Sequence, residues 1–477
     1  MSGAQTLTGT REARRAMPGR TSDLVQPART SPLPGTGICM VIVGLAITLG
    51  GGGTVNPQTE MVLQVLTALL MVPLVVSVNF QRGLGPIQAP AWLLAGLILL
   101  VPALQLVPLP PAVWRTLPGR AIEVQSLSLI QADQAWMPLT MAPARTFASL
   151  LATIFPVLLL LQVSRLSLRG RSWLCVVMVA GGIASLVLGV LQLSHSAGLE
   201  WSFYNQFSEG YLVGFQANRN AEADVLLIGI LAMGVVVSSR LADGRRHPLT
   251  WAALLLGLVM FGMGLFMTGS RTGIALLIIA LVFLGAILWP FVHKRTYALY
   301  GLAGGLGIIA VGGALLQLQS IQKIVARFSL TKETRWDLWA DTWYAIGQVW
   351  PFGSGIGTIV PMLEAAERLE VVDTTRPVRA HNDWLEWVLE AGLPGLVILG
   401  LIIIVLIVLV FRAIVASSQI DANPNRRAQT LFACGVLTIE ALHAVVDYPL
   451  RSMSLAMLTA TAVAFLLNSA ASQRTTQ

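Results

Sequence analysis

The feature that most constrains this chain is a series of apolar blocks, each about 18–22 residues long, separated by short polar stretches. A helix of that length spans the roughly 30 Å of hydrocarbon in a bilayer. The blocks do not alternate apolar and polar residues, as the strands of a membrane barrel do. Only 11% of the residues are charged, whereas a soluble domain carries about 25%. The sequence therefore predicts an all-α, polytopic transmembrane helix bundle.

The apolar blocks divide into about twelve predicted spans, with ends placed to within several residues. An even number of spans leaves both termini on the same side of the membrane. The predicted spans are 38–53, 61–80, 91–109, 147–164, 173–193, 221–239, 249–268, 272–291, 297–317, 393–411, 428–446 and 452–469.

Basic residues in alternate short loops predict the orientation, because positively charged loops stay in the cytoplasm. Residues 1–37, which hold five arginines and no apolar core, are expected to form a disordered cytoplasmic tail without a cleavable signal, and 471–477 a second tail. We therefore expect a multi-pass membrane protein with both termini on the cytoplasmic side. The basic loop residues are Arg82, Arg165, Arg169, Arg171, Arg240, Arg245, Arg246, Lys294, Arg295, Arg412, Arg426 and Arg427.

The net charge of +8 does not indicate a nucleic-acid partner, because the basic residues lie in these loops and form no stripe. Cys39, Cys175 and Cys434 lie in or beside apolar blocks, at spacings that suit neither disulfides nor a metal site. We expect them to be small buried hydrophobic residues. The sequence predicts neither a cofactor nor a metal centre.

Three longer segments, at about 110–146, 194–220 and 318–392, fall on the exoplasmic side in this topology. The last separates predicted helices 1–9 (38–317) from helices 10–12 (393–470), and an insertion of this length between spans is usually functional. We expect it to be a catalytic loop domain. It carries six of the 13 tryptophans, namely Trp336, Trp339, Trp343, Trp350, Trp384 and Trp387.

Trp336, Trp339, Trp343 and Trp350 recur at three-, four- and seven-residue spacing, which predicts one face of a helix opened by Arg335. Such a face is typical of an amphipathic helix anchored at the membrane interface. Some of the indoles, such as Trp339, could instead contact a saccharide, and both roles are compatible. After the helix, Gly355 and Gly357 permit a tight turn whose amides could bind an anion, although such loops are often only turns.

His381 precedes Asp383 and Glu386, whose spacing resembles a capping box and predicts the start of a short helix. Gly392-Leu393-Pro394-Gly395 is expected to end that helix before the next span. A lone histidine is usually structural. An exposed histidine in the longest loop, among carboxylates and indoles, is nevertheless a candidate general base.

Arg271, at the mouth of a predicted span, and Arg335 are candidate phosphate ligands, with Arg219 as a weaker third. A guanidinium stays charged and binds phosphate oxygens in bidentate fashion. The alternatives are snorkelling to the interface for Arg271 and an ordinary surface ion pair for Arg335.

Further ionisable residues gather at the outer ends of spans and not at the midplane, where a secondary transporter holds its substrate. They favour a site at the exoplasmic surface. They are Glu222, Asp224, Glu440, His443, Asp447 and Arg451.

Several of these motifs resemble those of the O-antigen ligase and O-antigen polymerase (WaaL/Wzy) superfamily, over roughly residues 200–455. The most specific is His381-Asn382 followed after nine residues by Gly392-Leu393-Pro394-Gly395. Gly269-Ser270-Arg271-Thr272-Gly273 is similar to the arginine motif of the family. Weaker similar segments are Asn218-Arg219-Asn220, Pro351 to Gly357, and His443 to Arg451, which includes Asp447.

The resemblance implies a GT-C-like fold and metal-independent, inverting glycosyl transfer at the periplasmic face, with an undecaprenyl-pyrophosphate-linked oligosaccharide as donor. His381, Arg271 and Arg335 would be the catalytic residues. Arg219, Asn218, Asn220, Gly355, Gly357, Asn382, Trp339 and Asp447 would bind substrate.

The same residues fit a polymerase of exopolysaccharide, capsule or O-antigen repeat units and a ligase that transfers glycan to lipid A–core. We favour the polymerase. Its partners would be the lipid-linked donor, a glycan acceptor, membrane lipids and polysaccharide export machinery. A flippase or transporter, or a purely structural membrane protein, is the alternative from another class.

Overall fold

The computed structural model describes residues 33–53, 57–194, 202–205, 207–244, 248–292, 335–372, 376, 378–419 and 423–467. Within these residues helices predominate, and the strands form one short antiparallel pair. The elements are α1 (Pro34–Leu49), α2 (Pro57–Val76), α3 (Val78–Gln81), α4 (Ala89–Gln105), β1 (Pro108–Leu109), α5 (Pro111–Trp114), α6 (Ala121–Leu129), β2 (Met137–Pro138), α7 (Pro143–Ser164), α8 (Leu168–Ser194), α9 (Arg219–Ala242), α10 (Pro248–Met267), α11 (Arg271–Leu288), η3 (Trp289–Phe291), α14 (Arg335–Val349), α15 (Ile359–Ala366), α16 (Asp383–Ser417), α17 (Pro424–His443), η4 (Pro449–Arg451) and α18 (Met453–Leu466).

Helices occupy every predicted span that falls on described residues, while the predicted span 297–317 lies outside them. Seven of the described helices are long and apolar enough to cross a membrane: α2, α7, α8, α9, α10, α11 with η3, and α16. α1, α4 and α18 are apolar but shorter. α17 carries Arg426, Arg427 and Glu440, which lower its hydropathy. The chain is thus an all-α, multi-pass membrane protein, and the number twelve stays a prediction.

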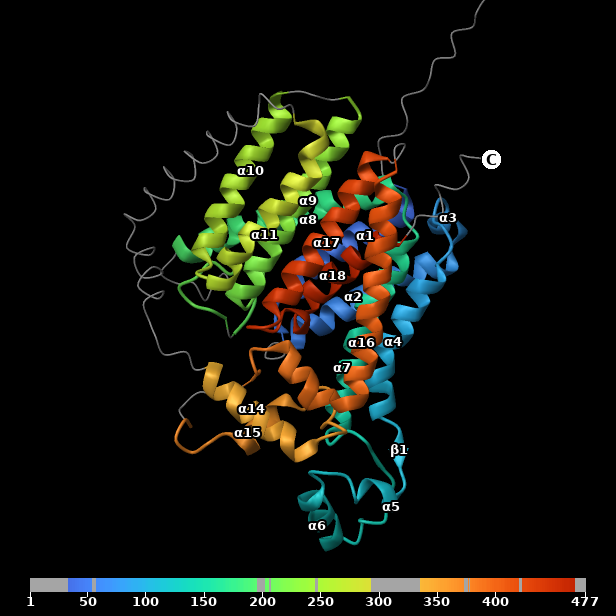
Figure 1. The fold of residues 1–477 in the computed structure, drawn as a ribbon, viewed down its shortest axis with the longest axis vertical. Coiled ribbons are helices and arrows are strands. Elements are labelled where there is room, and N and C mark those ends of the chain that lie inside the picture. The colour runs from blue at the N-terminus through green and yellow to red at the C-terminus, as the bar shows by residue number, and fades with distance from the viewer. Residues whose placement is uncertain are drawn as a thin grey trace, which may run out of the picture. The chain divides into compact units, whose positions relative to one another are not determined.

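α9 is the central helix of the bundle, because it packs against α8, α10, α11 and α17 (Figure 1). Its side chains are buried along almost the whole length, including the acidic residues Glu222 and Asp224 near its start. Gly229 lets the Phe261 ring approach, since a Cβ at this position would lie 3.1 Å from the ring. The bundle therefore encloses acidic side chains within an apolar core.

An outer segment, which we define as the described residues between 335 and 391, packs at one end of the bundle. α14 and α15 cover the start of α16 through a separate apolar core that includes Ala345, Ile359 and Leu389 (Figure 1). The Asp383 amide donates to the carbonyls of Ala444 (2.9 Å) and Asp447 (3.1 Å), just beyond α17. These bonds connect the predicted catalytic loop to the helix bundle.

α16 is broken at Gly392, as the sequence predicted. Gly392 has φ 57° and ψ −158°, a conformation that strains any residue with a Cβ. A Cβ here would also lie 2.4 Å from the Pro351 carbonyl oxygen. The Trp387 indole bridges the break by donating to the Gly395 carbonyl at 3.0 Å. The break separates the part of α16 in the outer segment from its apolar remainder.

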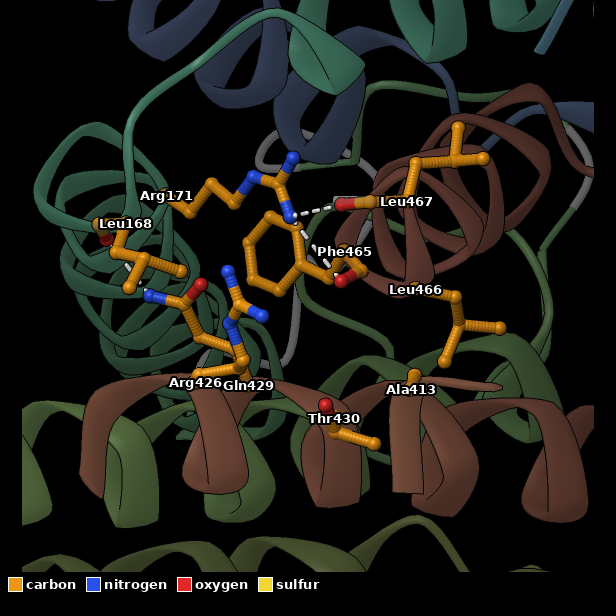
Figure 2. Close-up of a pocket in the computed structure, with 9 residues that line it drawn as sticks. All are labelled: Leu168, Arg171, Ala413, Arg426, Gln429, Thr430, Phe465, Leu466 and Leu467. Carbon is orange, nitrogen blue, oxygen red and sulfur yellow. Dashed lines mark hydrogen bonds between the residues drawn. The ribbon is translucent and has the colours of Figure 1, made fainter. Parts of the chain in front are cut away.

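The loops with predicted cytoplasmic arginines meet at the other end of the bundle. Arg171 and Arg426 line one small hollow there (Figure 2). Arg412 lines an adjoining hollow. Arg427 donates to the Ala286 carbonyl at the end of α11. Lys294, Arg295, Arg245 and Arg246 lie outside the described residues. The orientation of the bundle in the membrane stays a prediction.

Candidate functional site

His381 lies immediately before α16, at the end of the bundle that carries the outer segment. Its φ of 49° is in the left-handed region, and such strained residues are frequent at functional sites. Nδ1 of His381 is 2.9 Å from Oδ1 of Asp447, and its ring lies 5.0 Å from the Tyr448 ring. The side chain is 30% exposed, and no described residue hydrogen-bonds to its Nε2. Asp447 thus holds the imidazole at Nδ1, whereas Nε2 has no hydrogen-bond partner among the described residues.

Asp447 is buried and receives hydrogen bonds from α9 as well. Oδ2 accepts from Nδ2 of Asn220 at 2.6 Å and from Nδ2 of Asn218 at 3.4 Å. Asn218 is the N-cap of α9, since its side-chain oxygen accepts from the Asn220 amide. Burial raises the pKa of Asp447, but the bond and charge of His381, with the charges of His443 and Arg335, outweigh burial and lower it to about 2. Asp447 is therefore an anion that orients His381.

The structure corrects the predicted capping of α16. The N-cap is Asn382, whose side-chain oxygen accepts from the Leu385 amide at 3.0 Å. Glu386 does not reach back to cap the helix, because it accepts from the Arg379 guanidinium instead. The helix begins where the sequence predicted. The Asn382 side-chain oxygen caps the start of the helix and is therefore not free to bind a ligand.

The Gly355–Gly357 turn binds an anion, but that anion belongs to the chain itself. Oε1 of Glu390 accepts from the amides of Gly357 (2.9 Å) and Ile359 (3.1 Å). The Ile356 amide donates to the Gln105 side chain at 2.9 Å. The anion-binding prediction is thus corrected: these amides are occupied within the protein, and the turn holds α16 against α4.

A buried charge cluster that the sequence did not predict lies beneath His381. Arg451 contacts Asp383 and Glu386 at 3.3 Å each, and Glu390 at 3.0 Å. Arg379 pairs with Glu386 and lies over the Tyr448 ring, 5.8 Å from its centre. The three carboxylates recur at three- and four-residue spacing on one face of α16, a signal that could have indicated a shared partner.

Trp339 is connected to the histidine loop, because its indole nitrogen donates to the Ala380 carbonyl at 3.0 Å. Trp336 and Trp343 are each 66% exposed, while the opposite face of α14 is buried. α14 therefore presents part of its tryptophan face outward, as the sequence predicted. Its described start is Arg335, whose charge is one of those that stabilise the Asp447 anion.

Arg219 and Arg271 open the neighbouring helices α9 and α11. The Arg219 guanidinium lies 4.4 Å from the centre of the Tyr211 ring. A Cβ added to Gly269 would be 3.7 Å from its Nη1, so Arg219 lies beside the turn that leads to Arg271. Ser270 caps α11 by accepting from the Gly273 amide. The convergence of Arg271 on His381 stays a prediction.

The hollow in Figure 2 lies far from His381, because Arg426 and His443 are at opposite ends of α17. Arg171 fills much of it and donates to the carbonyls of Phe465 (3.1 Å) and Leu467 (2.9 Å) at the end of α18. About 10 Å³ is left, which is room for one water. The hollow is therefore filled by a structural contact between helix ends and is not a substrate site.

Across the described ranges, no three His, Cys, Asp or Glu side chains are arranged to hold a metal ion. Cys39 and Cys175 are buried, as expected, whereas Cys434 is half-buried.

The family model for O-antigen ligase matches residues 256–400, a range that includes Arg271, Arg335 and His381 but not Asp447. No curated protein matches the sequence significantly.

Proposed function

The chain belongs to the O-antigen ligase and O-antigen polymerase superfamily, whose domain matches residues 256–400, and we propose that it is a polysaccharide polymerase. The family transfers glycans from lipid-linked donors to acceptors. In our proposal an undecaprenyl-pyrophosphate-linked oligosaccharide is transferred to an acceptor sugar hydroxyl at the periplasmic face of the bacterial inner membrane. The observation that carries the proposal is the pairing of His381 with the Asp447 anion, which leaves Nε2 open.

His381 is the general base in this mechanism. The Asp447 carboxylate accepts from Nδ1–H and so favours the tautomer whose Nε2 has a lone pair. Nε2 then takes the proton of the acceptor hydroxyl, while the hydroxyl oxygen attacks the anomeric carbon from the face opposite the pyrophosphate. The anomeric C–O bond breaks, undecaprenyl pyrophosphate leaves, and the configuration inverts. Positioned base catalysis of this kind contributes about 10²–10⁴-fold.

Arg271 and Arg335 bind the pyrophosphate, with Arg219 beside them as a further contact. Negative charge grows on the leaving group as the anomeric bond breaks, so fixed guanidiniums stabilise the transition state more than the ground state. The influence of Arg335 on Asp447 supports its place near the base. Since the arginines supply the positive charge, the proposed reaction needs no metal.

Transfer to lipid A–core is the second candidate, because the matching family is described as O-antigen ligase. Both reactions use the same donor and the same base. They differ in the acceptor alone.

Purified protein in lipid nanodiscs, supplied with a synthetic undecaprenyl-pyrophosphate-linked repeat unit, tests the proposal. We expect longer lipid-linked glycans in the absence of lipid A–core, and loss of product in His381→Ala. Arg271→Ala and Arg335→Ala should each lower the rate about a hundredfold or more. Arg368→Ala is the matched control, because that exposed side chain pairs with Asp337 and Asp341 in the outer segment.

Products that form only with lipid A–core would contradict the polymerase proposal and support the ligase. In cells, His381→Ala should leave lipid-linked precursors on the outer leaflet. Precursors trapped on the inner leaflet, with full transfer activity in nanodiscs, would point to a flippase and contradict the proposal.

A further inference from the structure

α9 and the end of α17 are joined by two polar contacts that lie one helical turn apart. In the outer pair, Asn220 donates to Asp447 at 2.6 Å. In the inner pair, Nδ1 of His443 lies 2.7 Å from Oδ1 of Asp224. Asn220 and Asp224 are four residues apart on α9, and His443 and Asp447 are four apart in the chain. The two pairs therefore lie along one line, which is the contact between α9 and the end of α17.

The inner pair is buried more deeply than the outer one. The side chains of Asp224 and His443 are each 1% exposed, between helices that pack into the apolar core. Burying ionisable groups at such a position is costly, and groups retained there commonly serve function. Neither pair member contacts the exposed surface, so the inner pair does not itself meet a substrate.

A direct backbone link connects the inner pair to the base. The Asp447 amide donates to the His443 carbonyl at 2.9 Å, so the position of His443 fixes where the Asp447 backbone lies. The Asp447 side chain then reaches His381 with one oxygen and Asn220 with the other. A shift of α17 along α9 would move the carboxylate away from the imidazole.

The charges that face this line come from several elements. His443 faces Asp224 on α9, Asp447 beyond α17, and Arg335 on α14. Glu440, one turn earlier on α17, faces Asp224 and Asp383. His443 is also among the groups that lower the pKa of Asp447. The inner pair is thus coupled to the base through both position and charge.

We propose that Asp224 and His443 are positioning residues for the transfer reaction: their contact sets the register of α17 on α9 that aims Asp447 at His381. This inference rests on the proposed function, since it assigns a role relative to the general base. It adds two membrane-embedded residues that never touch the donor or the acceptor.

Asp224→Asn and His443→Asn test the inference. An asparagine side chain at 443 places an amide nitrogen near the position of Nδ1, so it keeps a donor but loses the imidazole. Each variant should lower kcat about tenfold, with the KM for the lipid-linked donor changed by less than about twofold.

Glu222→Gln is the matched control. Glu222 is equally buried near the start of α9, but it accepts from Ser185 on α8 and not from α17. It should keep the wild-type kcat and KM. The double variant of Asp224→Asn and His443→Asn should lose no more kcat than the slower of the two single variants, because both substitutions act on the same contact.

Wild-type kcat in both single variants, with His381→Ala inactive, would overturn the inference and leave the proposed function intact. A lower melting temperature with an unchanged kcat would also overturn it, since that result marks a purely structural pair. Transfer activity in His381→Ala would instead contradict the proposed function itself. His443→Leu, if it folds, should be slower than His443→Asn, and equal rates would contradict a role for the donor at this position.

Discussion

His381 and Asp447 are 66 residues apart in the chain, yet Nδ1 of the imidazole and Oδ1 of the carboxylate are 2.9 Å apart. This contact joins the start of α16 to the end of α17 and makes one functional unit of two motifs. His381 belongs to the outer segment, whereas Asp447 follows a helix of the bundle. Movement of the outer segment against the bundle would therefore change the state of the base.

Asp447→Asn should lower the transfer rate about 10- to 100-fold at neutral pH. The substitution keeps the shape but removes the negative charge, and a hydrogen bond to a charged group contributes about 1.5–3 kcal/mol. Initial rates with the lipid-linked donor measure the effect. Asp133→Asn, an acid in the 110–146 segment paired with Arg115, is the control. A wild-type rate in Asp447→Asn would show that Asp447 has no role in the mechanism.

The pH dependence of stability should also report Asp447. Its pKa is lowered to about 2, against about 3.9 in an unfolded chain. A depressed pKa contributes stability that is present above about pH 4 and is lost as the pH falls towards 2. The difference amounts to about 2.5 kcal/mol.

Thermal melting of the purified protein at pH values between about 6 and 3 measures this contribution. The stability difference between wild type and Asp447→Asn should shrink as the pH falls. A difference that stays constant over this range would contradict the assignment of Asp447 as a paired anion.

The apolar blocks predicted the helices well, because membrane spans are set by length and hydropathy. The sequence predicted the break at Gly392 and the start of the helix after His381 for similar local reasons. It placed the capping wrongly, since Asn382 and Asp383 are both good N-caps and only the tertiary contact of Asp383 with Arg451 distinguishes them.

The site was predictable residue by residue but not as a set of contacts. His381 and Asp447 were both candidates, yet nothing local indicates that the end of α17 packs on the start of α16. The sequence indicates that the amides of the glycine turn could bind an anion, but it does not identify Glu390 as the acceptor. Glu390 lies more than 30 residues further along the chain. Pairings of this kind depend on long-range packing.

Arg451→Ala should destabilise the protein by about 3–5 kcal/mol, because it leaves the buried carboxylates of Glu386 and Glu390 without their shared cation. Arg451→Lys should recover part of the loss, since lysine keeps the charge but not the planar geometry. Melting temperature in detergent measures both. Arg376→Ala, at the exposed ion pair with Glu364, should have little effect. Equal effects of Arg451→Ala and Arg376→Ala would contradict a buried cluster.

Gly392→Ala should destabilise the protein strongly, because the position has φ 57° and a Cβ would lie 2.4 Å from the Pro351 carbonyl oxygen. Gly400→Ala on the same helix is the matched control. A Cβ at Gly400 meets nothing within 4 Å, so alanine should stabilise that helix by about 0.5–1 kcal/mol. Thermal unfolding of the two variants measures the contrast, and a neutral Gly392→Ala would mean that the break is not required.

The most direct measurement is the structure of the protein bound to undecaprenyl pyrophosphate in nanodiscs, determined by electron cryo-microscopy. We expect the pyrophosphate between the guanidiniums of Arg271 and Arg335, and Nε2 of His381 facing the space where the acceptor hydroxyl would lie, about 3 Å away. Asp447 should keep its bond to Nδ1. A pyrophosphate bound at the bilayer midplane or at the Arg171 end of the bundle would contradict the account.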